Sequence, residues 1–424
     1  MTNSRWKTTT IQEFVDNGEA EVKTGPFGTQ MHASDYVEQG TPVINVRNIG
    51  FGSVVPEKLE YIGEETVDRL KGHLLRKNDI VFGRKGAVER HALIRDQHDG
   101  WFQGSDCLRL RVRSPELSPI FLSYCFLTDS HQKWMMNQCS HGATMASLNQ
   151  AIVCRIPLKY PDIRTQNTIS GLLSAYDDLI ETNTRRTKIL EQMAQMLYRE
   201  WFVNFRFPGH DKVKMVESEI GPIPQGWGAN TIGDLCDDIR RSVNPSDVPA
   251  ETPYIGLEHM PRKSIALSEW GEAGQVQSTK LRFNQGDILF GKIRPYFHKV
   301  GTAPINGVCS SDAIVIVPKE VKYSSVVLLC ASSDDFVAQA TQTSQGTKMP
   351  RANWGVLARY PIAIPDLPLL ERFNGIVVPM IELLINFIFR NRCLRKTRDL
   401  LLPKLVSGEV SVEQVESEVP AQTV

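Results

Sequence analysis

The sequence predicts an α+β protein in which two strand-rich, mixed globular domains alternate with two long helices that pair with each other. Three observations support this fold class. The stretch from Asp162 to Phe205 has no proline and a single glycine, and its apolar residues recur in steps of four and three, which is typical of a helix that packs along a partner. A second stretch near the end of the chain repeats this spacing. Short sequence words of the first half also recur in the same order in the second half, which indicates an internal duplication.

The first helix has a seam of apolar residues along one face. The seam consists of Ile169, Leu173, Tyr176, Ile180, Leu190 and Leu197. Polar Asn183 and Thr187 interrupt it, and a polar residue at such a position weakens a coiled coil but specifies its register. About 40 residues at a rise of 1.5 Å each give a rod of roughly 60 Å.

The second helix supplies the partner. Its seam consists of Phe373, Val377, Leu384, Phe387, Leu394 and Leu401. Asn391 takes the place that Thr187 has in the first seam, and both helices follow a Pro-Asp pair, at 161–162 and 365–366, which is a helix-start signal. Two unrelated amphipathic core helices are the alternative, but the shared spacing and the shared start favour a pair.

The duplication extends beyond the helices. Asn78–Arg84 reads NDIVFGR and Gly286–Lys292 reads GDILFGK, while Ser140–Met145 reads SHGATM and Ser344–Met349 reads SQGTKM. Spacings between such words drift, as expected when two halves share a framework and differ in their surface loops. We therefore divide the chain into a globular domain at 1–160, a central helix at 161–207, a globular domain at 208–364, a C-terminal helix at 365–410 and a flexible tail at 411–424.

Each globular half is predicted to be rich in strands. Asp79–Phe82 and Asp287–Phe290 are short apolar runs. Leu108–Val112 alternates with period two, which indicates a half-buried strand, whereas Ala313–Val317 indicates a fully buried one. Helices are expected at 118–138 and 324–342.

The composition, with 41% hydrophobic and 23% charged residues, is that of an ordinary soluble globular protein. The net charge is zero, so nucleic-acid binding would need local basic patches. The start of the chain has no apolar signal core, which predicts no secretion signal. The most apolar run, Ile376–Phe389, is interrupted by Pro379 and is judged too short to span a bilayer, so we expect a helix buried on more than one side. Eight cysteines without a C-x-x-C pair indicate neither a zinc site nor a redox motif and fit a reducing cytoplasm.

The sequence offers no catalytic or cofactor motif. It contains no G-x-x-x-x-G-K-[ST] phosphate loop. The stretch 244–247, NPSD, matches a methyltransferase N-P-P-[YF] box only in its first two residues, and the nine histidines show no metal-ligand spacing. We therefore predict a non-catalytic protein whose function is binding, with no catalytic, cofactor-binding or metal-binding residues.

Basic turns at equivalent places in both halves are the best candidates for a binding surface. In each half a strand that ends in Phe-Gly runs into a basic turn, and Arg and Lys on supported turns suit phosphate contacts and the reading of guanine edges. A glycine-containing loop at 23–30 and the repeated words at 140–145 and 344–349 are further candidates. The candidate DNA-binding residues are Lys23, Gly25, Thr29, Gln30, Arg84, Lys85, Arg90, His141, Thr144, Arg240, Arg241, Lys292, Arg294, Lys299, Lys348 and Arg351. A merely solvated turn is the alternative for each of them.

The segments that link domains and helices carry the most specific words. Leu197–Phe207 reads LYREWFVNFRF, Gly221–Trp227 reads GPIPQGW and Leu401–Val410 reads LLPKLVSGEV. These words resemble hallmarks of the specificity subunits of type I restriction-modification systems, and the resemblance covers nearly the whole chain. One departure is that Thr165-Gln166 and Leu369-Leu370 stand where that family often has Glu-Gln.

The resemblance implies that the globular domains are target-recognition domains and that the helices pair as an antiparallel coiled coil. It implies a cytoplasmic subunit, with no membrane association, that binds double-stranded DNA and docks two methyltransferase subunits and the restriction subunits. S-adenosylmethionine, ATP and magnesium are expected on those partners. Each domain would read one half of a bipartite, asymmetric site, and the helical pair would set the unread spacer. The alternative is a stand-alone two-domain DNA-binding or scaffold protein without enzyme partners.

Overall fold

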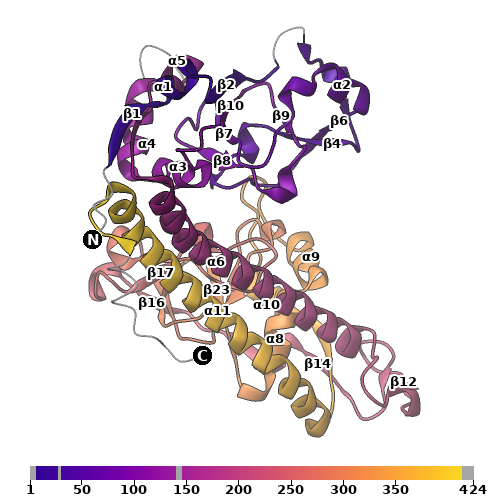
Figure 1. Cartoon of the computed structure of the whole chain (residues 1–424). Helices are drawn as coiled ribbons and strands as arrows, with labels where there is room; N and C mark the ends of the chain where they lie inside the picture. Colours follow the sequence, from indigo (N-terminus) through magenta and orange to yellow (C-terminus); the bar gives the residue numbers. More distant parts are fainter. Residues whose placement is uncertain (1–5, 27–29, 140–145, 413–424) are drawn as a thin grey trace. The chain divides into compact units, whose positions relative to one another are not determined.

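The computed structural model describes residues 6–26, 30–139 and 146–412 (Figure 1). The chain forms two compact units: unit 1 contains Met1–Asp177 and Arg395–Val424, and unit 2 contains Asp178–Leu394. Two long helices each begin in one unit and end in the other. Helix α6 spans Ile163–Tyr198 and α11 spans Leu367–Ser407, so each unit contains a part of both helices.

Both long helices begin where the Pro-Asp pairs predict. The Asp162 carboxylate accepts a hydrogen bond from the Thr165 backbone N–H at 3.0 Å. The Asp366 carboxylate accepts one from the Leu369 backbone N–H at 3.2 Å. Each aspartate therefore satisfies a donor of the first turn that the helix itself leaves unpaired.

In unit 1 the beginning of α6 packs against the end of α11. Ile169 and Leu173 share a hydrophobic core with Leu402 and Leu405. An ion pair of 2.5 Å between the Arg398 guanidinium and the Asp177 carboxylate lies along the same contact. A first turn packed on a last turn means that the two helices run antiparallel.

In unit 2 the end of α6 packs against the beginning of α11. Ala194 and Tyr198 share a core with Phe373 and Val377. Between the helices, the buried amide of Asn183 donates to the side-chain oxygen of Asn391 at 3.0 Å. A buried amide pair of this kind favours one register over its neighbours, because any slip would leave both amides without partners.

The predicted seam residues all lie on the inner faces of the two helices. Those that are fully buried are Ile169, Leu173, Ile180, Phe373, Val377, Leu384 and Phe387. Those that are half-buried are Tyr176, Leu190, Leu197, Leu394 and Leu401.

Helix α11 differs from the prediction made for the apolar run at 376–389. The helix continues through Pro379 and reaches 41 residues, so it is long and apolar enough to cross a membrane by length and composition. Phe373 and Val377 pack into the core of unit 2, whereas Leu383 and Phe389 are 43% and 41% exposed. The helix predicted at 365–410 is confirmed, but the expectation of burial on more than one side is wrong, because one face is core and the other carries apolar side chains at the surface.

The globular part of unit 1 contains two main sheets and a strand pair. A five-stranded sheet has the order β2-β10-β7-β8-β5 and a four-stranded sheet the order β3-β6-β4-β9, while β1 pairs with β11. The strands are β1 Lys7–Thr10, β2 Ala20–Thr24, β3 Tyr36–Val37, β4 Thr41–Ile44, β5 Phe51–Gly52, β6 Glu60–Ile62, β7 Ile80–Gly83, β8 His91–Leu93, β9 Phe102–Gln103, β10 Cys107–Val112 and β11 Pro157–Tyr160. The helices before α6 are α1 Ile11–Asp16, α2 Glu64–Arg69, α3 Pro119–Phe126, α4 Asp129–Cys139 and α5 Gln150–Cys154.

Unit 2 repeats this plan. A four-stranded sheet has the order β15-β23-β20-β21 and a five-stranded sheet the order β16-β19-β22-β17-β18, while β14 pairs with β24 and β12 with β13. The strands are β12 Met215–Val216, β13 Ile223–Pro224, β14 Gly228–Thr231, β15 Cys236–Asp238, β16 Arg241–Val243, β17 Pro253–Ile255, β18 Gly271–Glu272, β19 Lys280–Phe283, β20 Ile288–Gly291, β21 Val300–Thr302, β22 Gly307–Ser310, β23 Ala313–Pro318 and β24 Pro361–Ile364. The helices before α11 are α7 Ile232–Leu235, α8 Ser324–Ala331, α9 Asp334–Gln342 and α10 Trp354–Leu357.

The repeated sequence words form the same turn in both units. Asn78 and Gly286, which precede β7 and β20, both have a positive φ, of 71° and 89°. The Asn78 N–H donates to the Ile94 carbonyl at 2.8 Å, and the Gly286 N–H donates to the Ala303 carbonyl at 2.9 Å. Asparagine and glycine are the residues that adopt this left-handed conformation most readily. The same turn in both units therefore explains why the sequence word is repeated.

Two sequence predictions about the globular halves need correction. The helix expected at 118–138 is two helices, α3 and α4, and the helix expected at 324–342 is α8 and α9. The strand at Leu108–Val112 exists as β10, but Arg109 is only 1% exposed, so the alternating pattern does not give it a solvent face. The guanidinium of Arg109 pairs instead with the Glu21 carboxylate at 3.0 Å.

Candidate nucleic-acid interface

In unit 1 the register of the five-stranded sheet places two of the predicted DNA-binding loops at one edge. Strand β2 ends at Thr24 beside the start of β10, and β7 ends at Gly83 beside that same start. Strand β8 begins at His91 beside the end of β7. The basic stretch Arg84–Arg90 therefore leaves the sheet next to the loop that follows Thr24.

The third predicted loop reaches the same turn. The Gly86 N–H donates to the Ala146 carbonyl at 3.1 Å, and Lys85 forms a β-bridge with Ser147. The segment after residue 145 thus lies against the basic turn. The predicted residues Thr29, His141 and Thr144 lie outside the described residues.

Two basic side chains at this edge already contact other side chains of unit 1. The Lys85 ammonium lies 3.2 Å from the Asp106 carboxylate. The Arg90 guanidinium lies 5.2 Å from the centre of the Phe51 ring, and Phe51 is 50% exposed. Arg84 is partly exposed at the end of β7.

The loop that follows β2 differs from its predicted role. Gly25 is buried and its N–H donates to the Cys107 carbonyl at 2.9 Å, so that donor is not available to a phosphate. A Cβ at Gly25 would lie 2.0 Å from the Gly104 carbonyl oxygen, so this glycine permits close packing of two loops. The Lys23 ammonium donates to the Gly72 carbonyl at 3.1 Å, and the side chain of Gln30 is exposed.

Unit 2 gathers its candidate residues at the equivalent edge. Strand β20 ends at Gly291 beside the start of β23, and β21 begins at Val300 beside β20. The Ile239 N–H donates to the Val315 carbonyl at 2.9 Å, so the chain leaves β15 toward the same edge at Arg240 and Arg241. Ile293 forms a β-bridge with Arg351.

One carboxylate holds two of these cations. The Lys292 ammonium lies 4.0 Å from the Asp312 carboxylate and donates to the Ser311 carbonyl at 2.6 Å. The Arg351 guanidinium lies 3.7 Å from the same carboxylate. Asp312 is the counterpart of Asp106 in unit 1, so an acidic residue beside the basic turn is common to both edges.

The other candidate DNA-binding residues of unit 2 differ in whether their side chains already contact groups within the unit. The Arg240 guanidinium lies 2.7 Å from the Asp238 carboxylate, and Arg241 is exposed. The Arg294 guanidinium donates to the carbonyl of Lys348, whose side chain is exposed, at 3.3 Å. The Lys299 ammonium donates to the Leu257 carbonyl, and burial lowers the pKa of Lys299.

Two features of these edges were not predicted from the sequence. A Ser-Asp pair occurs at both 105–106 and 311–312, but its aspartate was not expected to orient the neighbouring cations. Arg282 was also missed, although it is exposed and lies directly opposite Arg241 in the pairing of β16 with β19. The repeat itself was the available signal for the aspartates, whereas the Arg241–Arg282 pairing depends on a strand register that the sequence did not reveal.

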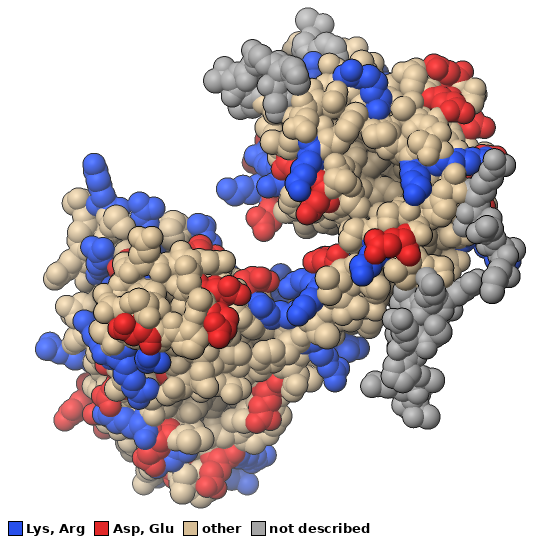
Figure 2. All heavy atoms as spheres, turned by 90° about the vertical axis from the view of Figure 1, so that its left-hand side faces the viewer, with Lys and Arg blue, Asp and Glu red and all other residues tan. Residues whose placement is uncertain are grey.

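The surface charge is mixed. Figure 2 shows Lys and Arg side chains interspersed with Asp and Glu over the visible face of each globular part. This distribution agrees with a net charge of zero. Binding to a polyanion would therefore depend on local groups such as these two edges rather than on a uniform field.

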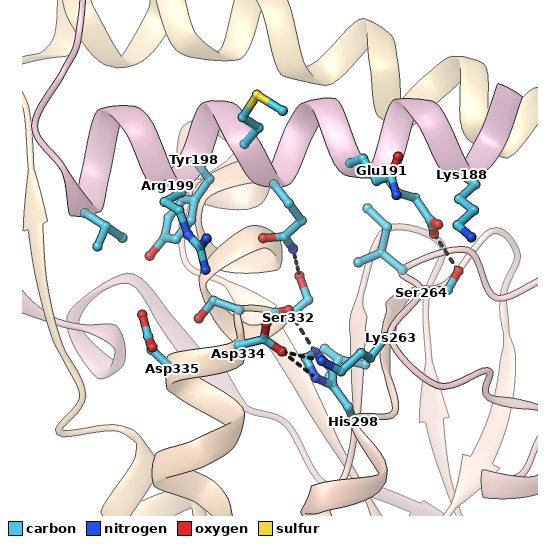
Figure 3. Close-up of a pocket in the computed structure, with 17 residues that line it drawn as sticks. Lys188, Glu191, Tyr198, Arg199, Lys263, Ser264, His298, Ser332, Asp334 and Asp335 are labelled. Atoms are coloured by element: carbon cyan, nitrogen blue, oxygen red, sulfur yellow. Dashed lines mark hydrogen bonds and ion pairs between the residues drawn. The ribbon is translucent and has the colours of Figure 1, made fainter. Parts of the chain in front are cut away.

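Unit 2 also contains a cavity of about 400 Å³ between α6 and its globular part (Figure 3). Glu191 extends from α6 and accepts hydrogen bonds from the Ser264 hydroxyl at 2.5 Å and the Ala266 N–H at 3.0 Å. Burial raises the pKa of Glu191. On the opposite wall, the Lys263 ammonium and the His298 ring both face the Asp334 carboxylate, at 2.9 Å and 3.4 Å.

The contacts of Glu191 fasten α6 to the globular part of unit 2. Among the described residues there is no cluster of three or more His, Cys, Asp or Glu side chains that could hold a metal ion. Several polar groups of the cavity pair with one another, as the dashed contacts of Figure 3 show. The arrangement that can recognise an external ligand is the basic edge of each unit.

Known proteins resemble this chain in sequence. The family model described as the type I restriction modification DNA specificity domain matches residues 3–192. The chain is 26% identical over 308 residues to the type I restriction enzyme MjaIX specificity subunit of Methanocaldococcus jannaschii, which covers 70% of each chain. It is 22% identical to the type I restriction enzyme HindI specificity subunit of Haemophilus influenzae, over 86% of this chain and 94% of that one.

The fold agrees as well. The crystal structure of a type I restriction-modification system S subunit from M. genitalium superposes with a TM-score of 0.61 at 15% sequence identity, over 96% of this chain and 97% of that one. The family match, the curated relatives and the shared fold agree with the alternation of duplicated globular parts and paired helices. This chain is therefore similar, in sequence and in fold, to specificity subunits of type I restriction-modification systems.

Proposed function

We propose that this chain is the non-catalytic DNA-recognition subunit of a type I restriction-modification complex, and that each unit reads one half of a bipartite, asymmetric site. The observation that carries the proposal is the basic turn at the same sheet edge in both units, with Lys85 beside Asp106 in one and Lys292 beside Asp312 in the other. Lysine and arginine on a rigid edge can contact phosphates and base edges. Because the two turns differ in sequence, the two half-sites are expected to differ too.

A domain exchange tests the assignment of half-sites. Residues 15–150 are replaced by the matching segment of a relative with a different methylation motif, and the methylome of a host that carries the system is sequenced. One half of the methylated motif should change while the other half and the spacing stay the same. If both halves changed together, the assignment of one half-site to each unit would be wrong.

The exposed side of the helices supports docking of partner subunits. On α6, Ile189, Met193 and Met196 are 46%, 44% and 64% exposed, and their steps of four and three put them on one face. Leu383 and Phe389 add exposed apolar surface on α11. Exposed apolar side chains on one face of a helix are typical of an interaction site.

We expect this surface to bind the methyltransferase subunits, two per chain, with the restriction subunits joining them in the cytoplasm. S-adenosylmethionine, ATP and magnesium would then be bound by those partners. Met193→Lys together with Met196→Lys should abolish copurification of the methyltransferase subunit and leave the isolated chain folded. Retained copurification would place the docking surface elsewhere.

We further propose that the helical pair sets the length of the unread spacer. Arg186 of α6 contacts the ring of Phe387 of α11, with 6.0 Å from the guanidinium carbon to the ring centre, so an insertion in one helix alone would disturb the pairing. Seven residues inserted both after Arg186 and after Phe387 add roughly 10 Å to each helix and preserve the heptad. The methylated motif should gain about three base pairs of spacer at 3.4 Å each, with both half-sites unchanged. An unchanged spacer in a folded, active variant would mean that the helices do not set it.

A further inference from the structure

The loop that joins β20 to β21 has an unusual backbone. Its tip, Pro295–Phe297, is a single 3-10 turn between Arg294 and His298, whose φ angles are 49° and 52°. Both residues carry a Cβ and are in the left-handed region, which is unfavourable for all residues but glycine and, to a lesser degree, asparagine and aspartate. Such a conformation persists only where surrounding contacts enforce it.

Contacts on both sides enforce it here. The Arg294 N–H donates to the Pro350 carbonyl at 2.7 Å. A ring nitrogen of His298 lies 2.9 Å from the Ser332 carbonyl oxygen, and the His298 carbonyl accepts from the Lys263 N–H at 2.9 Å. The tip is therefore held at both ends by segments distant in sequence, so it is presented as a rigid feature.

The rigid tip presents an aromatic ring to the surface. Tyr296 is 51% exposed. Its ring packs edge-on against Phe297, with 4.9 Å between ring centres, and the Arg262 guanidinium covers Phe297 at 4.2 Å. An exposed, immobilised ring loses little conformational entropy when it contacts a ligand, because its position is already restricted.

The tip lies at the basic edge of unit 2, because the loop connects the end of β20 with the start of β21. In unit 1 the equivalent loop is Arg84–Arg90, which reads RKGAVER and contains no aromatic residue. The two units therefore offer different chemistry at the same place in the fold.

We propose that Tyr296 contacts the C5-methyl group of a thymine in the half-site that unit 2 reads. This inference rests on the proposed function of the chain as the DNA-recognition subunit. Of the groups that base pairs display in the major groove, the thymine methyl is the apolar one, and aromatic and other apolar side chains recognise it. Neighbouring Lys292 and Arg351 can contact phosphates or base edges beside it, so the ring adds an apolar contact to a basic edge.

The test replaces thymine by uracil, which lacks only this methyl group. The methylome supplies the recognised motif, and the domain exchange described above identifies the half that belongs to unit 2. The full complex with its methyltransferase subunits is titrated with duplexes that carry a single thymine-to-uracil change at each thymine of that half. One position should weaken binding by the unaltered complex about fourfold, the value of one methyl group removed from water.

Two variants of Tyr296 and one control make the result specific. Tyr296→Ala should bind the unmodified site as weakly as the unaltered protein binds the uracil site, with no further loss on the uracil site, whereas Tyr296→Phe should retain the discrimination. Phe51→Ala, which removes an equally exposed ring from unit 1, should leave the uracil response of this half-site unchanged.

The outcomes separate the inference from the proposed function. A uracil effect of the same size in Tyr296→Ala and in the unaltered protein would overturn the inference, as would a half-site of unit 2 that contains no thymine. A complex that binds its motif no better than random duplex would instead overturn the proposed function.

Discussion

Two equivalent strands of the duplicated fold carry opposite chemistry. Strand β10 of unit 1 reads CLRLRV, and β23 of unit 2 reads AIVIVP. Through their pairing with β7 and β20, Arg109 stands where Val315 stands in the other unit, opposite Val81 and Leu289 respectively. Arg109 and Val315 are both 1% exposed, so the same interior position accepts a guanidinium in one unit and an isopropyl group in the other.

The comparison shows that strand register and burial, rather than the chemistry of one side chain, are what the two units share. The Arg109 guanidinium is accommodated by Glu21 and by the Gly72 and Leu74 carbonyls, at 3.0, 3.1 and 3.3 Å. Burial lowers the pKa of Arg109, yet a guanidinium remains charged in proteins. A buried charge is tolerated only where neighbouring groups compensate it, and unit 1 provides such groups.

The largest expected effect is the loss of that compensation. Arg109→Ala should destabilise unit 1 by about 3 kcal/mol, because two carbonyls and a carboxylate each lose one of their donors and a cavity forms. Val315→Ala, the matched change in unit 2, should cost about 1–3 kcal/mol from the reduced apolar packing alone. Urea unfolding of both variants, followed by hydrogen exchange to localise the loss, measures the difference.

A second variant tests this difference directly by making the interior of unit 1 resemble that of unit 2. Arg109→Val with Glu21→Gln gives unit 1 the apolar residue of unit 2 and neutralises the carboxylate that Arg109 faces, whose other partner is the exposed Arg113. It should recover most of the stability lost in Arg109→Ala, since apolar replacements of buried ion pairs are often neutral or stabilising. No recovery would mean that the two interiors differ in more than this position.

The next effect is a difference in acid sensitivity. Burial lowers the pKa of His73 to about 4, of His91 to about 3 and of His131 to about 4, and all three lie in unit 1. An unfolded histidine titrates near 6.5, so between about pH 6.5 and 3 the unfolded chain binds more protons than the folded unit. The free energy that the neutral histidines contribute to the folded state is fully present above pH 6.5. It is lost as the pH falls, and His91 alone accounts for a loss of about 2 kcal/mol at pH 5.

Unit 2 contains groups of the opposite sign. Burial raises the pKa of Glu191 and of Asp287, so protonation of these carboxyls favours the folded state as the pH falls. Unit 1 should therefore unfold first on acidification from pH 7 to 5, as measured by limited proteolysis with fragment identification. His91→Leu should weaken the pH dependence of unit 1, and simultaneous unfolding of both units with an unchanged pH profile would contradict the assignment.

A smaller effect is expected on DNA binding. The paired variants are Arg84→Ala with Lys85→Ala in unit 1, and Lys292→Ala with Arg351→Ala in unit 2. Each pair should lower affinity by at least about 1 kcal/mol where a side chain reads a base, or flatten the salt dependence by about one for each phosphate that a side chain neutralises. Base reading also predicts that discrimination falls in one half-site only. Unchanged affinity and an unchanged salt slope in either variant would mean that its turn is solvated and does not contact DNA.

The smallest effect concerns the aspartates beside the turns. Asp312 orients two cations and Asp106 one, and partly exposed ion pairs of this kind contribute about 0.2–1 kcal/mol each. Asp312→Asn should reduce the ratio of specific to random-duplex affinity more than Asp106→Asn does, because it releases two side chains. Equal ratios of specific to random-duplex affinity in the two variants would mean that the aspartates do not orient the neighbouring cations.

Much of the architecture was predictable because its signals are local. The start of α6 follows from Pro161-Asp162, and its buried face follows from the spacing of Ile169 and Leu173, since neighbouring turns of one helix determine both. The strands at β7 and β20 follow from two related words. The extent of α11 was also predicted, because the seam from Phe373 to Leu401 continues past Pro379, although proline normally ends or kinks a helix. What the sequence did not reveal is that Leu383 and Phe389 lie exposed, because tertiary packing covers only one face of the helix.

The candidate site was likewise predictable from the sequence only in part. By itself the sequence determined that basic turns occur twice, after related strands, because a repeated word specifies a repeated turn. Only the tertiary structure decided that loops more than 50 residues apart share one sheet edge, that Gly25 serves packing, that Arg109 is buried, and that Asp312 holds both Lys292 and Arg351. Hydrogen bonds and ion pairs between distant residues depend on strand register, and register is set by the packing of the whole sheet rather than by any single stretch of sequence.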